Sequence, residues 1–412
     1  MNSKLIFSVL ALLSIILSIR LAIHFLSVTS YPPGTNITFE TQVLAQPKIS
    51  SRGQQVSLTL PNSQRISARL ALEPLLSYGD KVKVGGKIEY FKAKNGDNVA
   101  FMNYPEFKIV KKGSDNLLYN LRKRIINFFN SSLSPSHSAL MLGIVFGIKQ
   151  EMPQTFYENL KISGVLHVIA ASGMNVTMVG GFLASIFAYF LKRQLALILS
   201  VFGILFYAFM AGLEPSIVRA SIMGILVFGS QIIGRQNASF LGLFMAGFLM
   251  LFINPSILFD IGFQLSFMAT LGLIYLRPLF FISSKAKNLI RKSIIGEDLT
   301  TTLTAQIFTL PILLANFGTY SLVSIAVNAI VLWTVPILMV VGGIATVLGL
   351  ITEPVGRLAL YFSLPFLFYF ETLVNFFGFK SQQLAIDYLP LAFAGGYYLI
   401  LLALILFIKN KK

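Results

Sequence analysis

Apolar residues form long uninterrupted runs in this chain, and the longest runs predict helices that cross a membrane. A helix needs about 20 mostly apolar residues to cross the ~30 Å hydrocarbon core of a bilayer. The run at 321–350 is long and contains Pro336, which removes a backbone hydrogen bond, so we expect a kink or break there. We expect ten spans, at 5–28, 165–191, 195–212, 216–233, 238–253, 256–276, 301–318, 321–350, 357–378 and 388–408.

The first apolar run predicts an anchor helix over residues 1–29. It is long for the apolar part of a signal peptide, and Arg20 and His24 interrupt it. No small-x-small cleavage motif ends it. We therefore expect it to be retained as an anchor.

Residues 30–113 follow a different pattern, in which polar and apolar residues alternate over short stretches separated by Pro, Gly, Asn and Asp. A period of two with turn residues between the stretches is typical of β-strands. A small all-β domain with about five strands would suit a barrel such as an OB-fold. The expected strands are 36–44, 55–60, 65–70, 81–91 and 106–111.

Residues 114–163 predict amphipathic, interfacial helices between this β domain and the membrane-embedded region at 164–412. The basic cluster at 122–124 lies beside large apolar residues, which favours a helix at the membrane surface. The apolar stretch at 138–148 is too short to span a bilayer, so we expect it to be interfacial or re-entrant. The fold class is thus a polytopic α-helical membrane protein with an inserted small β domain.

Composition agrees with that class, since 55% of the residues are hydrophobic and only 12% are charged. Soluble domains carry roughly 25% charged residues. The net charge is +17, from 33 Lys and Arg against 16 Asp and Glu. Basic cytoplasmic loops explain this balance, and so does a polyanionic substrate; charge alone does not separate the two.

The distribution of basic residues predicts the orientation of the chain. A cytoplasmic N-terminus places the basic loop at 277–292 and the basic C-terminus inside, in agreement with the positive-inside rule. The β domain would then lie outside. We expect a multi-pass protein of the inner (plasma) membrane with both termini cytoplasmic.

Several kinds of chemistry are not expected of this chain. It has no cysteine and three histidines, His24, His137 and His167, which is too few for a dinuclear metallohydrolase. The segment 85–88 lacks the leading glycine and the Ser/Thr of a phosphate-binding loop. We expect no enzyme activity, no metal and no cofactor.

Polar residues inside the apolar runs are the candidate functional residues, because an ionised side chain there costs about 2.5–3.5 kcal/mol. On a regular helix, His167, Ala171 and Asn175 would share one face, which suits either close helix packing or a wet cavity. Arg219 could pair with Glu214, or its fork of donors could bind phosphate. The full set is His167, Ser172, Gly173, Asn175, Thr177, Arg219, Asp260, Gln264, Ser266, Gln306 and Asn328.

The order of these motifs resembles that of ComEC-type competence proteins. Residues 167–176 are similar to the family's His-x-x-Ala-x-Ser-Gly-x-His segment, and further similar segments follow in the family's order over roughly residues 30–340. The resemblance implies an inner-membrane channel through which one DNA strand passes during natural transformation. The other similar segments are 79–84, 143–147, 218–220, 262–267 and 305–328.

Two departures from the family pattern matter. Asn175 stands where the family has its second histidine, and an amide cannot become cationic. Many family members also carry a metallo-β-lactamase-like domain thought to degrade the other strand, whereas no His-x-His-x-Asp-His motif occurs in residues 1–412. We expect strand degradation to come from another protein.

The β domain interleaves basic and aromatic residues, as single-strand binders do. A solvated face over a small core explains the same pattern, and it is the resemblance that favours DNA contact. The candidate residues are Lys81, Lys83, Lys87, Tyr90, Phe91, Lys92 and Lys94.

A channel without a motor implies partners. We expect single-stranded DNA, membrane lipid, a cytoplasmic ATPase motor or single-strand-binding protein, and a separate nuclease and DNA receptor. A transporter of a small solute or lipid is an alternative. An intramembrane hydrolase is a weaker one, because five positions on a helix turn the side chains of His167 and Ser172 about 140° apart.

Overall fold

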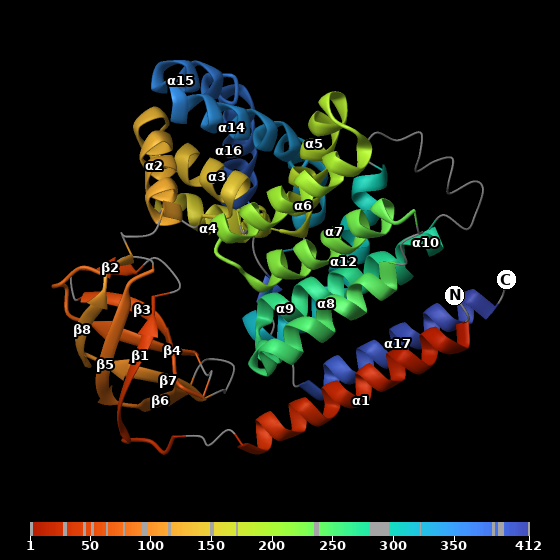
Figure 1. Cartoon of the computed structure of the whole chain (residues 1–412), viewed down its shortest axis with the longest axis horizontal. Coiled ribbons are helices and arrows are strands. Elements are labelled where there is room, and N and C mark those ends of the chain that lie inside the picture. Colours follow the sequence, from red (N-terminus) through yellow and green to blue (C-terminus); the bar gives the residue numbers. More distant parts are fainter. Residues whose placement is uncertain are drawn as a thin grey trace. The chain divides into compact units, whose positions relative to one another are not determined.

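The computed structural model describes two compact units. The first comprises residues 1–124 and 248–258, and the second comprises 125–247 and 259–412. Figure 1 shows the helices and strands of each. The described residues are 3–27, 31–43, 47–50, 53–62, 65–76, 79–92, 98–113, 117–148, 152–169, 172–234, 239–280, 296–321, 323–380, 384–385 and 391–410.

The β domain of the first unit consists of two sheets. One has the strand order β1-β5-β8 and the other has the order β2-β3-β4-β7-β6. All pairings are antiparallel except that of β4 with β7. The strands are β1 (Asn36–Gln42), β2 (Lys48–Ser50), β3 (Gly53–Thr59), β4 (Arg65–Leu70), β5 (Lys81–Lys87), β6 (Glu89–Lys92), β7 (Asn98–Asn103) and β8 (Glu106–Lys111).

Alternating side chains build the core of this domain, as the period of two predicts. On β5, for example, Val82 and Val84 are fully buried and the lysines between and beside them are exposed. The expected strand at 81–91 divides at the buried Ile88 into β5 and β6, which belong to different sheets. The strands β2 and β7 were not expected, and the OB-fold stays a prediction.

The second unit is helical. Helices α5, α6 and α7 share a buried core that includes Val176, Ile204 and Ile217, while α9 packs against both α7 and α12. Helix α1 (Ser3–Ser27) belongs to the first unit. The remaining helices are α2 (Leu117–Ser132), α3 (Pro135–Phe146), α4 (Gln154–Ser163), η2 (Leu166–Val168), α5 (Gly173–Phe190), α6 (Arg193–Met210), α7 (Pro215–Ile232), α8 (Ser239–Ile253), η3 (Pro255–Phe259), α9 (Ile261–Tyr275), α10 (Arg277–Phe280), α12 (Gly296–Phe317), α13 (Ser324–Val331), α14 (Thr334–Ile351), α15 (Glu353–Tyr361), α16 (Leu364–Lys380) and α17 (Leu391–Asn410).

Within the described residues, seven helices are long and apolar enough to cross a membrane, or eight if α15 and α16, bent by 51°, form one span. Three shorter apolar helices lie at 135–146, 239–253 and 393–408. The multi-span class is therefore supported. The count of ten stays a prediction.

The expected span at 165–191 is wrong at its N-terminal end. Gly164 adopts a left-handed conformation (φ 76°) that ends α4, and the following residues form the short 3-10 helix η2. Ser172 is extended, so α5 begins only at Gly173. Because this break separates them, His167 and Asn175 do not share a helical face; Ala171 lies outside the described residues.

The expected break in the run at 321–350 is confirmed. Helices α13 and α14 are separated by Leu332 and Trp333, just before Pro336. Pro336 has no N–H to offer the carbonyl of Leu332, and the N–H of Val335 takes its place at 3.1 Å. The proline thus becomes an early residue of a new helix, where its missing donor costs nothing.

The short helix α3 lies inside the second unit. Nine of its twelve residues, His137 to Val145, are buried, and it packs against α14. An interfacial helix would leave one face open. Its placement relative to the membrane, interfacial or re-entrant, stays a prediction.

Candidate functional site

Arg219 is the centre of a polar cluster between α7 and α9. Its side chain is buried, and Nε donates to Oγ of Ser266 at 2.9 Å. Nη1 donates to Oγ1 of Thr270 at 2.6 Å and approaches Sδ of Met223 at 3.5 Å. Ser266 and Thr270 are four residues apart, so one face of α9 presents both hydroxyls to the guanidinium.

The start of α5 completes this cluster. A Cβ at Gly173 would lie 2.9 Å from Nη2 of Arg219, so any larger residue there would push the guanidinium from its present position. The N-terminus of a helix carries a partial positive charge from its free N–H groups. Two positive features therefore meet at Gly173.

The guanidinium of Arg219 lacks a balancing carboxylate in the part of the chain that the structure describes. No described Asp or Glu oxygen lies within 4.0 Å of it, and the ion pair with Glu214 that the sequence left open is not formed. Its described partners are neutral hydroxyls and a thioether. A buried cation held only by neutral groups is electrostatically incomplete.

Asn175 connects the start of α5 with α3. It is buried, accepts a hydrogen bond from Oγ of Ser172 at 3.0 Å and donates to the carbonyl of Ile144 at 2.8 Å. An amide can accept and donate at once without a charge. Thr177, by contrast, bonds only to carbonyls of its own helix, at Gly173 and Met174.

A second polar cluster is formed by α12, β9 (Thr319–Tyr320) and α13. Nε2 of Gln306 donates to Oγ of Ser324 at 3.0 Å, and Oε1 accepts from the Tyr320 hydroxyl at 2.7 Å. Burial raises the pKa of Tyr320, with the Ser324 hydrogen bond opposing, so this hydroxyl stays a donor. Gly164 packs directly against Ser324, which brings the loop before His167 to this cluster.

Two buried oxygens, one in α13 and one just before it, have no partner among the described residues. They are Oδ1 of Asn328 and Oγ of Ser321. Asn328 is 2% exposed and lies one helical turn from Ser324. Buried polar groups are almost always hydrogen-bonded, so these two indicate a place for water or a polar ligand.

The remaining candidates have local roles or lie at the edge of the clusters. Asp260 is the N-cap of α9 and accepts from the N–H of Phe263 at 3.0 Å. Gln264 lies in the first turn of α9, two residues before Ser266. His167 is exposed on η2, with Nδ1 at 3.1 Å from the carbonyl of Gly164, and makes no hydrogen bond to Ser172.

The sequence analysis missed one pair of ionisable residues, the buried His137 and the partly exposed Glu371. Nε2 of His137 on α3 lies 2.8 Å from Oε2 of Glu371 on α16, at ion-pair distance though not aligned as a hydrogen bond. The ring of Phe368 packs edge-on against His137, 4.8 Å between centroids. Each residue is an isolated ionisable group in an apolar stretch, which is the signal that could have found it.

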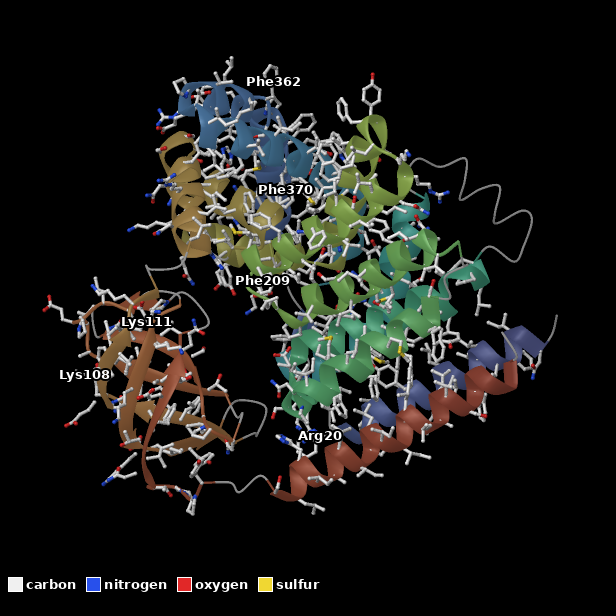
Figure 2. The ribbon with its side chains drawn as sticks, in the orientation of Figure 1. Arg20, Lys108, Lys111, Phe209, Phe362 and Phe370 are labelled. Carbon is white, nitrogen blue, oxygen red and sulfur yellow. The ribbon has the colours of Figure 1, made fainter. Side chains whose placement is uncertain are left out.

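The β domain presents a lysine ladder, defined here as Lys81, Lys83, Lys108 and Lys111. All four are exposed, and the strand register sets Lys83 opposite Lys108 and Lys81 opposite Lys111 across β5 and β8. Figure 2 labels the two lysines on β8, which the sequence did not single out. Like charges directly opposite one another destabilise a sheet, and on the other side of β5 the exposed Glu40 of β1 lies opposite Lys83 and offsets part of this repulsion.

The other candidate residues of the β domain are partly exposed and partly packed against the core. Lys87 is exposed at the end of β5, and Phe91 is 51% exposed with Phe101 beside it. Tyr90 instead packs against the core and donates to the carbonyl of Tyr31 at 2.9 Å, so its ring is not free for stacking. Lys94 and the side chain of Lys92 lie outside the described residues.

Comparison with known proteins gives a family match for most of the helical region. Residues 144–411 match the family model described as Competence protein. The chain is 32% identical over 246 residues to ComE operon protein 3 of Bacillus subtilis (strain 168), which covers 58% of this chain and 30% of that protein. An uncharacterized protein of Aquifex aeolicus (strain VF5) is 32% identical over 155 residues, 37% of each chain.

The matched region spans about a third of the length of these curated relatives. No solved structure matches the chain. Both polar clusters lie within the residues that the family model covers.

Proposed function

This chain belongs to the competence protein family, and from that premise we propose that it acts in DNA uptake during natural transformation, as an inner-membrane channel for single-stranded DNA. Support comes from the match over 144–411 and from the apolar helices of the second unit. The B. subtilis relative is named only for its operon, so the substrate and the channel activity are part of the proposal.

The observation that carries the proposal is the buried Arg219 without a described carboxylate. Leaving a charge unpaired inside a protein costs several kcal/mol, which a passing anion would offset. A guanidinium binds phosphate through two parallel hydrogen bonds, about twice as strong as neutral ones. A DNA phosphate would thus be a better partner than the hydroxyls of Ser266 and Thr270.

The arrangement described here corresponds to a closed channel under this proposal. The clusters are largely bonded to themselves, through Arg219 with Ser266 and through Gln306 with Ser324. Opening would separate α9 from α7 and exchange the hydroxyls for phosphate. The unpartnered oxygens of Asn328 and Ser321 would extend the hydrated route from the first cluster toward α13.

The β domain would lie outside the cell and receive the strand. Its lysine ladder offers positive charges in a row along two neighbouring strands, and the exposed Phe91 offers a stacking surface. The expected placement of both termini in the cytoplasm belongs to this proposal. So do an ATPase motor or single-strand-binding protein inside the cell, and a separate nuclease and DNA receptor.

The test replaces Arg219 in a transformable strain that depends on this chain. Arg219→Gln keeps hydrogen-bonding capacity but removes the charge. The interaction with a DNA phosphate should weaken by roughly 3 kcal/mol, which should lower transformation frequency about 100-fold. DNA bound to the cell surface should not change. Arg219→Lys should lose less, because it keeps the charge without the fork of donors.

Arg357→Gln is the matched control, since Arg357 pairs with Glu353 at the surface of α15. It should transform like the wild type. The melting temperature of each purified variant separates a channel defect from misfolding. Wild-type transformation by a stably folded Arg219→Gln variant would remove the channel proposal.

A transporter for a small solute or lipid is the second candidate. The breaks between α13 and α14 and between α15 and α16 favour it equally, because transporters use such interrupted helices around a central site. Under this alternative, Arg219→Gln would leave transformation unchanged and impair solute uptake in reconstituted vesicles.

A further inference from the structure

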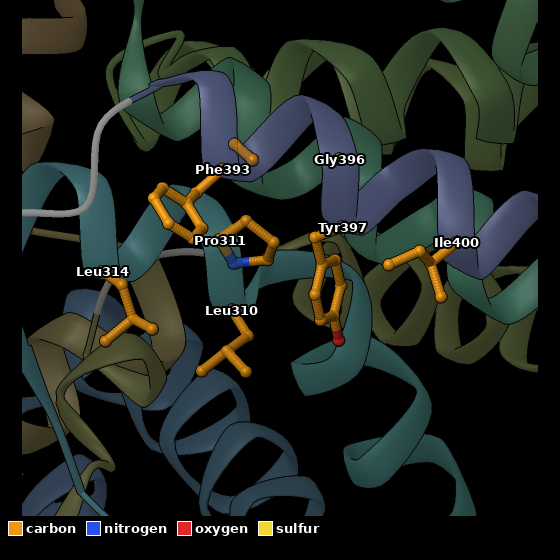
Figure 3. Close-up of a pocket in the computed structure, with 8 residues that line it drawn as sticks. Leu310, Pro311, Leu314, Phe393, Gly396, Tyr397 and Ile400 are labelled. Atoms are coloured by element: carbon orange, nitrogen blue, oxygen red, sulfur yellow. The ribbon is translucent and has the colours of Figure 1, made fainter.

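An apolar crevice lies between α12 and α17, and none of the residues that line it belongs to either polar cluster (Figure 3). Its volume is about 470 Å³. This size is within the roughly 300–1,000 Å³ range of small-ligand sites. The residues that define it include Leu310, Pro311, Leu314, Phe393, Gly396 and Ile400.

The crevice exists because of two residue types. Pro311 lies inside α12, where it has no N–H and its ring prevents normal packing of the helix. On the opposite wall, Gly396 has no side chain, and a Cβ placed on it would meet nothing within 4 Å. The two helices therefore meet without filling the space between them.

The polar groups at its edge are already satisfied. Without an N–H at Pro311, the carbonyl of Ile307 loses its helical partner, and the hydroxyl of Tyr397 donates to it at 3.1 Å. The hydroxyl of Tyr398 donates to the carbonyl of Phe308 at 2.8 Å. The walls that remain are aliphatic and aromatic, and such cavities do not hold water.

The surroundings identify the occupant. Both helices are apolar over 299–317 and 393–408, as in membrane helices. At the rim, Phe393 is 66% and Ile400 is 65% exposed, whereas Leu314 at the base is 8% exposed. A crevice that opens through exposed apolar residues toward hydrocarbon is accessible to lipid chains and closed to polar ligands.

We propose that this crevice binds one acyl chain of a membrane phospholipid, packed on Pro311 between α12 and α17. The chain replaces the van der Waals contacts that the proline and the glycine forgo. This inference rests on the membrane location of the two helices and not on transport of DNA. It holds or fails independently of the channel proposal.

The test uses the full-length protein reconstituted in vesicles of phosphatidylcholine that carries a photoreactive diazirine in the middle of one acyl chain. After illumination, mass spectrometry locates the adducts. Binding in the crevice predicts adducts on the segment 310–314. Bulk lipid would label the exposed face of α17 instead, for example at Leu399 or Leu402.

Two neighbouring glycines supply the variant and its control. Gly396→Phe should fill the crevice, and because close-packed space excludes a lipid chain, adducts on 310–314 should fall at least about fivefold. Gly395 also has open space around it but does not line the crevice, so Gly395→Phe should label like the wild type.

Equal labelling of 310–314 in both variants would overturn the proposal. So would a wild-type protein labelled only on the exposed face of α17. Loss of labelling in both variants would show that the reaction reports helix packing and not the crevice, which also contradicts the proposal.

Discussion

Arg219 and Asp260 are both charged residues within apolar runs, yet their hydrogen-bond partners differ in kind. The carboxylate of Asp260 accepts the N–H of Phe263 and caps α9, so a structural role accounts for it. Arg219 meets hydroxyls that carry no charge. A charged side chain that caps a helix has a structural role. A buried charge that contacts only neutral groups is instead expected to bind a charged ligand.

The pair His137 and Glu371 gives a stability prediction. Glu371→Ala leaves the buried ring of His137 without the carboxylate beside it and should cost about 1–3 kcal/mol. Glu353→Ala removes the exposed partner of Arg357 and should cost less than about 1 kcal/mol. Melting temperatures in one detergent compare the two. Equal, small losses would mean that the buried contact contributes nothing.

Gly173 gives a prediction about geometry. A methyl group there would press on Nη2 of Arg219, and overpacking of this kind costs about 1–3 kcal/mol. Gly173→Ala should therefore lower transformation roughly tenfold. Gly181→Ala on the same helix meets open space and should be neutral or slightly stabilising. Similar transformation by both variants would contradict the assigned contact.

Sequence reasoning found the residue types of the site better than their contacts. Arg219, Ser266 and Gly173 were singled out by their position in apolar runs, and the fold brings them together. Thr270 was not, because a threonine in a helix carries no warning of its tertiary partner. His137 and Glu371 lie more than 230 positions apart, so only folding reveals that they meet.

Helix ends were predictable where the backbone chemistry forces them. Pro336 separates α13 from α14 because it cannot donate to Leu332. The end of α4 at Ser163 agrees with the expected end of the interfacial helices, but the break between η2 and α5 was not predicted, because the apolar pattern continues through it. The hydropathy pattern therefore gave one span where the structure has η2 and α5.

The contact between α12 and α17 gives a prediction about how two helices stabilise each other. Tyr397→Phe leaves the carbonyl of Ile307 without a donor and should cost about 1–3 kcal/mol. In a Pro311→Ala background, the restored N–H of residue 311 can take that carbonyl, so the same change should cost much less. A double-mutant cycle on melting free energies measures the difference. Equal costs in both backgrounds would show that Tyr397 does not compensate for the missing N–H of Pro311.

The two units differ in how much of each the family match covers. The family match begins at residue 144 and so covers the helical unit but not the β domain. The class of the whole molecule was predictable, because long apolar runs and a stretch of period-two alternation each have one common structural outcome. Which helices lie side by side was not, since any apolar face can pack against any other.

The lysine ladder of the β domain implies two opposite responses to sodium chloride. Each of two lysines on β5 lies opposite a lysine on β8, and salt screens these two repulsions along with the single attraction between Lys83 and Glu40 of β1. The melting temperature of residues 31–113, produced alone around their own core, should therefore increase with added salt. Its affinity for an oligothymidylate should decrease, since counterions compete with the strand. Lys83→Gln with Lys108→Gln should flatten both curves together, whereas an effect on only one of them would separate the strain in the sheet from the capture of the polyanion.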